Sequence, residues 1–423
     1  MTNLQESPKA STVDQSTFAA LCAADGEFIL AAKGWTGGLR IDIGEAAVGV
    51  TVDDGDVSAV IPVAGSGVIA LSASDEVWQP VLAAIPAPLK NCAYPLISRG
   101  QIEVEADGLT MWQYMPALDR AIELLRPVDE SRPVVVDESG ATPRHDSPVG
   151  RYVHLSLGDV DHRVYYEEAG QGIPLLCQHT AGANGLQYRH LFEMSEITDH
   201  FRVIAYDLPF HGKSIPPVDT RWWESEYALK GEFLRSVPVQ LAAALELDQP
   251  VFMGCSVGGL LALDLAYHHP DVFRAVVSLE GALRIGGDWN AMAGMHHPQV
   301  SNMAKARMME GLCSPTSPEP YVKEVSQVYS AGWPAAFRGD LYYYMVDYDL
   351  REVAGDIDTA RCGVHIMNGE YDWSGTVEHG RSAHEAIAGS THTVMTDVGH
   401  FPMQENPTAF AEYLLPVLDS IRT

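Results

Sequence analysis

The run Gly254-Cys255-Ser256-Val257-Gly258-Gly259 constrains this chain more than any other stretch of its sequence. It follows a short apolar segment, residues 250–253, and precedes an apolar segment with helical spacing, residues 260–266. A G-x-S-x-G pattern between a strand and a helix is typical of a nucleophile elbow, a tight turn that exposes a serine hydroxyl at the edge of a sheet. Small neighbours let strand and helix approach closely, and the first amides of the helix point at developing negative charge. The pattern therefore predicts an α/β sheet with Ser256 as a nucleophile.

Length and composition limit the classes of protein that need to be considered. A chain of 423 residues exceeds one ordinary hydrophobic core and predicts two domains. The formal net charge of -29 predicts a surface that repels nucleic acid and anionic membranes, and we expect neither as a partner. No segment is apolar for long enough to span a bilayer.

Cysteine usage and the first residues bear on the compartment. The six cysteines are dispersed without C-x-x-C spacing, and residues 1–7 lack the basic start and apolar core of an export signal. We therefore expect buried thiols in a cytoplasmic protein rather than a disulfide framework or a zinc site.

A proline-, serine- and charge-rich stretch divides the chain in two. It predicts an accessory domain at residues 1–127, a linker at 128–149 and a second domain at 150–423. In the accessory domain, residues 39–43 and 47–52 alternate as half-buried strands do, and residues 75–85 and 110–125 have helical spacing. This order of elements resembles the small α+β fold of sterol carrier proteins (SCP2-like). The resemblance implies an apolar cavity or a pairing surface and no catalysis.

Beyond the linker, strands alternate with helices, which indicates a mostly parallel α/β sheet. The predicted hairpin covers residues 152–157 and 162–168, and the later strands are expected at residues 174–179, 201–206, 250–253, 275–279, 364–367 and 392–395.

Five motifs beside strand ends carry a family resemblance. They are His179-Thr180-Ala181-Gly182, the segment 207–214 from Asp207 to Ser214, the Ser256 run, Gly369-Glu370-Tyr371-Asp372 and Gly399-His400-Phe401-Pro402. With these motifs in this order, residues 150–423 resemble the α/β-hydrolase superfamily.

The resemblance implies a catalytic triad in the chain order serine, acid, histidine. Ser256 would be the nucleophile, His400 the base after the last strand, and Asp372 the acid that orients the imidazole. Glu280, at the end of the preceding strand, is the alternative acid. The backbone amides of Val257 and Ala181 would form the oxyanion hole, although Thr180 stands where many relatives carry glycine.

The strand and helix alternation lapses between about residue 287 and residue 356, where superfamily members insert a helical cap. Methionines and tyrosines gather there, and such side chains adapt to apolar, ring-bearing ligands or form an ordinary packed bundle. We name four residues as candidates for the substrate pocket: Thr180, Trp223, Tyr343 and Trp373. Asp207 and His211 are expected to hold a loop. No histidine pair has a third partner at ligand spacing, so neither a metal nor a cofactor is expected.

Three functions fit these patterns. The first is a serine hydrolase that cleaves an ester or lactone of a medium-sized apolar or aromatic small molecule through an acyl-enzyme. The second keeps the triad but cleaves a carbon–carbon bond of a diketone or ring-fission product. The third is a non-catalytic carrier of hydrophobic ligands. We expect the chain to act as a homodimer.

Overall fold

A computed structural model describes residues 14–135 and 145–422 of the chain. These residues form two compact units. The first comprises the described residues up to Ser131 together with His297–Gly311, and the second comprises Arg132–His296 and Leu312 onward. The division between Ser131 and Arg132 falls inside the stretch that the sequence analysis assigns to a linker. Residues 136–144 of that stretch, and residues 1–7, which bear on export, lie outside the described residues.

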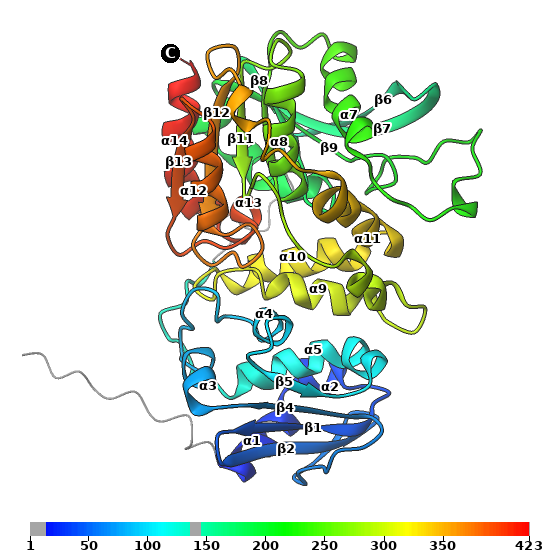
Figure 1. The fold of residues 1–423 in the computed structure, drawn as a ribbon, viewed down its shortest axis with the longest axis vertical. Helices are drawn as coiled ribbons and strands as arrows, with labels where there is room; N and C mark the ends of the chain where they lie inside the picture. The colour runs from blue at the N-terminus through cyan, green and yellow to red at the C-terminus, as the bar shows by residue number, and fades with distance from the viewer. Residues whose placement is uncertain (1–13, 136–144, 423) are drawn as a thin grey trace, which may run out of the picture. The chain divides into compact units, whose positions relative to one another are not determined.

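The first unit is built on a five-stranded sheet with the order β3-β2-β1-β4-β5 (Figure 1). Strands β1 and β4 are parallel, whereas β1 with β2, β2 with β3 and β4 with β5 are antiparallel. Its elements are α1 (Gln15–Ala24), α2 (Gly26–Ala31), β1 (Thr36–Ile43), β2 (Ala46–Asp53), β3 (Asp56–Ser58), β4 (Val68–Ala73), α3 (Asp75–Val81), α4 (Tyr94–Ser98), β5 (Glu103–Glu105), α5 (Gly108–Leu124) and α9 (Asn302–Glu310). Alternate strand residues such as Leu39, Ile41 and Val50 share one apolar core with α1, α2 and α5.

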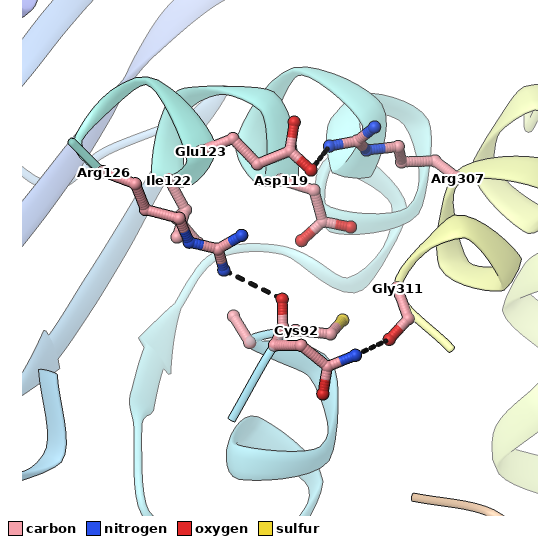
Figure 2. A pocket seen from close by; sticks show the side chains of 9 residues that line it. Cys92, Asp119, Ile122, Glu123, Arg126, Arg307 and Gly311 are labelled. Atoms are coloured by element: carbon pink, nitrogen blue, oxygen red, sulfur yellow. Dashed lines mark hydrogen bonds and ion pairs between the residues drawn. The ribbon is translucent and has the colours of Figure 1, made fainter. Parts of the chain in front are cut away.

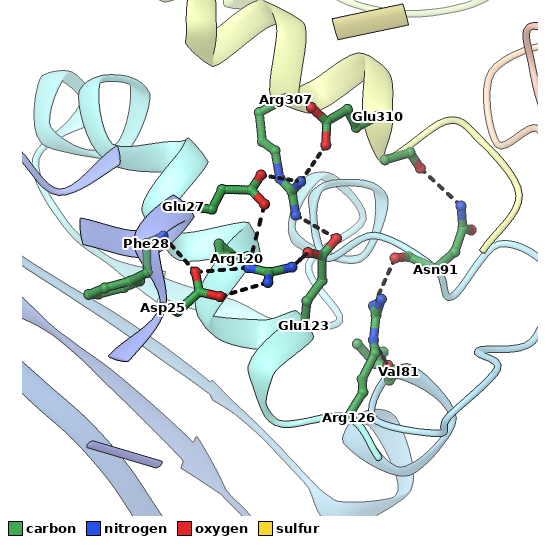
Figure 3. Close-up of polar contacts among 11 residues, drawn as sticks. Asp25, Glu27, Phe28, Val81, Asn91, Arg120, Glu123, Arg126, Arg307 and Glu310 are labelled. Atoms are coloured by element: carbon green, nitrogen blue, oxygen red, sulfur yellow. Dashed lines mark hydrogen bonds and ion pairs between the residues drawn. The ribbon is translucent and has the colours of Figure 1, made fainter. Parts of the chain in front are cut away.

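Helix α9 comes from far along the chain and packs against α5 (Figure 1). It lies inside the range 287–356 that the sequence analysis assigns to a cap on the second domain, yet its contacts place it in the first unit. Figure 3 shows the reason. The guanidinium of Arg307 is buried and pairs with Glu123 (2.5 Å), Glu310 (2.5 Å) and Glu27 (3.5 Å).

A small polar cavity of about 20 Å³ lies beside this ion-pair cluster. Figure 2 shows Cys92, Asp119, Glu123, Arg126 and Arg307 around it. A cavity of this volume holds about one water molecule. It is therefore far too small, and too polar, to take up an apolar ligand.

The second unit contains an eight-stranded sheet with the order β13-β12-β11-β10-β8-β9-β7-β6. The strands from β8 to β13 are parallel, and β7 and β6 add an antiparallel hairpin beside β9. The sheet is therefore mixed, with the predicted hairpin as its antiparallel part. Its strands are β6 (Val149–Leu157), β7 (Val160–Gly170), β8 (Ile173–Gln178), β9 (Phe201–Tyr206), β10 (Val251–Cys255), β11 (Ala275–Leu279), β12 (Gly363–Gly369) and β13 (Thr391–Met395).

Helices flank this sheet, and the strands are apolar on both faces, as expected for parallel strands covered on both sides. Leu175, Met253 and Val277 belong to a core shared with α14, whereas the alternate residues Leu176 and Phe252 are buried on the opposite face. The helical segments are η2 (Gly185–Glu193), α6 (Ser195–Thr198), η3 (Trp222–Glu224), α7 (Gly231–Ala244), α8 (Val257–His268), η4 (Trp289–His296), α10 (Glu319–Ala331), α11 (Pro334–Tyr342), η5 (Tyr343–Asp347), η6 (Ala354–Asp356), α12 (Val377–Ala386), α13 (Pro402–Glu405) and α14 (Pro407–Arg422).

The segments α10, α11 and η5 lie between β11 and β12 in sequence and interrupt the strand and helix alternation. None of the helices in residues 14–135 and 145–422 combines the length and the apolar character needed to cross a bilayer.

Candidate active site

Ser256 occupies the turn between β10 and α8. Its backbone has φ 59° and ψ −112°, a conformation that residues with a side chain rarely adopt. Glycines make the turn possible, because a Cβ at Gly254 would lie 2.3 Å from the carbonyl oxygen of Gly258, and one at Gly259 would lie 2.1 Å from that of Leu279. The N–H of Ser256 donates to the Leu279 carbonyl at 2.9 Å. The serine is thus held at the carboxyl end of its strand.

Asp372 and His400 follow β12 and β13, which continue the parallel strands from β10 through β11. The Nδ1 atom of His400 lies 2.6 Å from Oδ2 of Asp372. An ionised carboxylate can only accept, so Nδ1 of His400 donates its N–H to Asp372. The thiol of Cys255, next to Ser256, donates to the carbonyl of His400 at 3.0 Å. These contacts bring the elbow and the Asp372–His400 pair to one edge of the sheet.

Asp372 is completely buried but ionised. Its carboxylate also accepts the N–H groups of Ser374 at 2.7 Å and Gly375 at 2.9 Å. Burial acts to raise the pKa of Asp372, but the charge of His400 and the hydrogen bonds outweigh burial and lower that pKa. The arrangement therefore favours a negative carboxylate that stabilises a positive imidazole.

Glu280, the alternative acid of the sequence analysis, lies beyond Asp372 at the end of β11. Both of its carboxyl oxygens accept the N–H of Gly369, at 2.8 and 2.9 Å. Burial and then the charge of Asp372 raise the pKa of Glu280 well above its ordinary value. The neutral carboxyl of Glu280 donates its O–H to Asp372. Asp372 is therefore the carboxylate that contacts His400, and Glu280 interacts with Asp372.

The loop that carries His400 is held from two sides. The N–H of His400 donates to the carbonyl of Leu312 at 3.0 Å. The buried carboxyl group of Glu405 accepts the N–H of Gly399 at 2.7 Å, that of Ser314 at 2.9 Å and that of Phe401 at 3.2 Å. The imidazole is consequently fixed by the backbone as well as by Asp372.

Tyr344 lies on η5, and its hydroxyl is 3.0 Å from Oγ of Ser374. Tyr343, a candidate pocket residue, has different partners: its hydroxyl donates to Asp264 at 3.0 Å, and its ring packs against Tyr348. Consecutive residues of a helical turn face different directions, so the neighbours Tyr343 and Tyr344 have different partners.

The loop after β8 presents an unused amide at Ala181. The N–H of Thr180 donates to Oε1 of Gln187 at 3.0 Å, and the N–H of Gly182 donates to Oδ2 of Asp340 at 2.7 Å. Within the described parts of the chain, the N–H of Ala181 between them has no hydrogen-bond acceptor. Val257 is the first residue of α8, where backbone N–H groups have no acceptor within the helix. Ala181 and Val257 therefore carry the amides available to an oxyanion.

Asp340, on α11, fixes this loop. Besides the hydrogen bond from the N–H of Gly182, its buried carboxylate accepts hydrogen bonds from Nε2 of His211 at 2.8 Å and from the hydroxyl of Tyr227 at 3.1 Å. Burial opposes a charge on His211, but Asp340 reverses that effect and raises the pKa of His211. Asp207 holds the same region, because it accepts the N–H groups of Gly185 and Lys213. Asp340 was missed in the sequence, where its signal is a lone acid in an apolar helix.

The other candidate pocket residues have different surroundings. The hydroxyl of Thr180 is buried against Gln187 and Tyr329, Trp373 is half-buried, and Trp223 is 61% exposed. Among the described residues there is no group of three or more histidines, cysteines or carboxylates arranged to hold a metal ion.

Comparison with known proteins places the second unit in a family. Residues 173–407, more than half of the chain, match the family described as alpha/beta hydrolase fold. The family match begins at residue 173 and includes none of residues 1–127. The SCP2-like resemblance of the accessory domain therefore stays a prediction.

Curated relatives include two kinds of enzyme. A pimeloyl-acyl-carrier-protein methyl ester esterase of Vibrio vulnificus is 23% identical over 60% of this chain and 96% of its own length. The 3-oxoadipate enol-lactonase 2 of Acinetobacter baylyi is 26% identical over 56% of this chain and 85% of its own length. A Vibrio cholerae esterase of the first kind is 28% identical, but that alignment spans less than half, 46%, of the relative.

Solved structures share the fold of the second unit. A thermophilic esterase from Thermogutta terrifontis superposes with a TM-score of 0.56 at 18% identity and covers 64% of this chain and 100% of its own. The enol-lactonase from Burkholderia xenovorans gives a TM-score of 0.54 at 20% identity, covering 63% of this chain and 100% of its own.

Proposed function

This chain belongs to the α/β-hydrolase family, and we propose that it is a serine hydrolase that cleaves an ester or lactone of a medium-sized apolar or aromatic small molecule. The relatives named as a methyl ester esterase and an enol-lactonase support this reaction class. The aromatic residues of the region between β11 and β12 support the substrate class, since rings recognise rings and apolar chains.

In the proposed reaction, His400 takes the proton of Ser256 through Nε2 while the serine oxygen attacks the carbonyl carbon. The amides of Ala181 and Val257 bind the oxyanion of the tetrahedral intermediate. His400 then gives its proton to the leaving oxygen, which departs as an alcohol, or stays attached in the case of a lactone. Water, activated by His400, hydrolyses the acyl-enzyme and restores Ser256.

One observation carries the proposal: the strained elbow serine and the 2.6 Å contact between His400 and Asp372 occur at one sheet edge. A bare serine hydroxyl is a weak nucleophile at neutral pH and needs such a base.

The decisive experiment compares the wild type with Ser256→Ala on aryl esters, lactones and vinylogous diketones. We expect turnover of an ester or lactone by the variant to fall by roughly three to six decades. Labelling by a fluorophosphonate should disappear in parallel. Unchanged hydrolysis in Ser256→Ala would refute the mechanism. Release of a ketone or enol from the diketones, with esters untouched, would favour carbon–carbon cleavage instead.

For the accessory domain, we propose a supporting rather than a ligand-carrying role. The SCP2-like interpretation anticipates an apolar cavity. The cavity beside Arg307 is polar and has room for about one water molecule, which argues against a lipid-sized ligand there.

A further inference from the structure

A larger cavity, of about 420 Å³, lies within the second unit and contains neither Ser256, Asp372 nor His400. Its volume falls within the range of small-molecule sites, about 300–1,000 Å³. Four aromatic side chains and one pair of opposite charges characterise its wall: Trp222, Trp223, Tyr227, Trp333, Glu226 and Arg338.

The aromatic rings form a connected surface. The ring centroids of Trp222 and Trp333 are 5.4 Å apart with planes at 83°, and those of Tyr227 and Trp333 are 5.6 Å apart at 55°. Trp223 stands edge-on to Trp222 and is 61% exposed. A large exposed indole beside packed rings offers a free face on which a flat ligand can stack.

Arg338 supplies an oriented cation. Its guanidinium lies 3.7 Å from the ring centroid of Trp289, and the Nε1–H of Trp289 donates to the carbonyl oxygen of Arg338 at 2.8 Å. One end of the guanidinium pairs with Glu226. In residues 14–135 and 145–422, the buried Nε–H of Arg338 finds no acceptor. A fixed guanidinium with an unused donor is suited to a carboxylate, which can accept two parallel N–H groups.

We propose that this cavity is a binding site for a planar aromatic carboxylate, with the ring against Trp222 and Trp223 and the carboxylate on Arg338. Glu226 competes with the ligand for the guanidinium and is 60% exposed, so it can turn into solvent when the ligand binds. A cationic aromatic ligand would meet Arg338 and is disfavoured. A neutral one would leave the Nε–H unsatisfied.

The site adjoins the oxyanion loop through a chain of hydrogen bonds. Tyr227 lines the cavity and donates to Oδ1 of Asp340 at 3.1 Å, and Oδ2 of Asp340 holds the N–H of Gly182 at 2.7 Å. The bound carboxylate could therefore be the distal part of a substrate or a separate effector. Both share the same recognition chemistry, and kinetics distinguish them.

The test measures binding of 2-naphthoate and 2-naphthol to the full chain carrying Ser256→Ala, by calorimetry and by quenching of tryptophan fluorescence. Because this variant needs no catalysis, failure here is separate from failure of the proposed hydrolase activity. We expect saturable binding of 2-naphthoate and weaker binding of 2-naphthol. Adding Arg338→Gln should weaken 2-naphthoate roughly tenfold or more and 2-naphthol much less. Adding Trp223→Ala should weaken both.

A variant that gains affinity is also needed, because misfolding of a variant cannot explain tighter binding. Glu226→Gln removes the competing carboxylate and should strengthen 2-naphthoate binding severalfold. Arg163→Gln is the matched control, because Arg163 also lies over an aromatic ring, Tyr152, but outside the cavity. Its affinity should match the parent. No saturable binding, or affinities that ignore Arg338 and Glu226, would overturn the proposal.

Kinetics of the wild type then distinguish a part of the substrate pocket from a separate effector site. Competitive inhibition of naphthyl ester hydrolysis by 2-naphthoate, lost in Arg338→Gln, supports the site as part of the substrate pocket. A change in kcat that depends on Arg338, with KM unchanged, supports it as an effector site. Inhibition that persists in Arg338→Gln contradicts it.

Discussion

Both units bury charged side chains, but they neutralise them differently. In the first unit, Glu123 meets Arg307, a cation that stays charged at any ordinary pH. In the second, Asp372 meets the imidazole of His400 and the carboxyl group of Glu280, whose pKa burial and the charge of Asp372 raise well above its ordinary value. A carboxylate paired with arginine faces a permanent positive charge. A carboxylate facing an imidazole can stabilise the positive charge that an imidazole acquires when it accepts a proton. A carboxylate side chain thus stabilises structure in one unit, whereas in the other it is arranged to support proton transfer.

The largest effect should come from breaking the second arrangement. Asp372→Asn preserves the shape but disfavours the tautomer of His400 that carries a proton on Nδ1, so we expect kcat to fall by about 10⁴. Glu280→Gln keeps a neutral donor toward Asp372 and should lower kcat by about tenfold or less, since it changes only a supporting hydrogen bond. Steady-state kinetics on one aryl ester measure both. A larger loss in Glu280→Gln would reverse the assignment of the acid.

Breaking the first arrangement should cost stability instead of chemistry. Arg307→Met removes the buried guanidinium on which Glu123, Glu310 and Glu27 converge, so we expect the first unit to lose about 3–5 kcal/mol of its free energy of unfolding. The matched control is Arg120→Met. Arg120 pairs with Asp25 at 2.7 Å, with Glu123 at 3.1 Å and with Glu27 at 3.6 Å, but its side chain is 24% exposed. We expect it to cost about 1 kcal/mol.

Hydrogen exchange in α5 separates this loss from the stability of the second unit. The kcat of folded Arg307→Met should stay within about threefold of the wild type, because the substitution leaves the Asp372–His400 pair intact. Equal protection of α5 in both arginine variants would show that burial of the Arg307 ion pairs does not matter.

A smaller effect is expected where a fixed charge supports the chemistry. Asp340→Asn places an amide where three donors converge and loosens the peptide that presents the N–H of Ala181. We expect kcat to fall by about 10–100-fold, less than for loss of an oxyanion donor outright, with little change in KM. Tyr227→Phe, which removes only one of the three donors, is the control and should lose much less. A change confined to KM would place Asp340 in substrate binding.

The smallest effect concerns Asp119, beside the small polar cavity. Burial raises the pKa of Asp119 to about 7 from an ordinary value of 3.8. Between these values the folded state holds a proton that the unfolded state has lost, so the free energy of unfolding falls as pH rises from about 4 to about 7. Asp119→Asn should therefore stabilise the first unit by about 1–2 kcal/mol at pH 8, a magnitude reduced because solvent reaches part of the side chain.

At pH 4 the same substitution should be nearly neutral. Hydrogen exchange in α5, corrected for the intrinsic pH dependence of exchange, provides the measurement. A benefit that is equal at the two pH values would show that Asp119 stays ionised in the folded chain.

The fold of the second unit could be predicted because its signals are local. Apolar strands, helical spacing and the motifs around Ser256, Asp372 and His400 each lie within a few consecutive residues. Asp340 and Tyr344 could not be found in this way, because their roles depend on how α11 and η5 pack against distant loops. A run of three tyrosines, residues 342–344, does not reveal that the Tyr343 hydroxyl contacts Asp264 and the Tyr344 hydroxyl contacts Ser374.

The placement of α9 was equally inaccessible. The sequence around Arg307 falls in the range that predicts a cap, and the partners of Arg307, Glu27 and Glu123, lie some 180 to 280 residues earlier in the chain. Charge pairing at such a separation leaves no periodic pattern. The boundary of the first unit therefore follows from the packed structure and not from composition.

The insertion of α9 into the first unit has a consequence for biosynthesis. A ribosome releases the N-terminal segment long before residues 297–311 emerge, and domains generally begin to fold as they appear. Until then, the ion-pair cluster around Glu123 and Glu27 has Arg120 but lacks Arg307, so this unit must wait, incompletely assembled, for more than half of the remaining polypeptide to be translated. A fragment ending near residue 131 should accordingly be a poor substitute for the natural unit, and supplying a peptide spanning 297–311 should help it to fold.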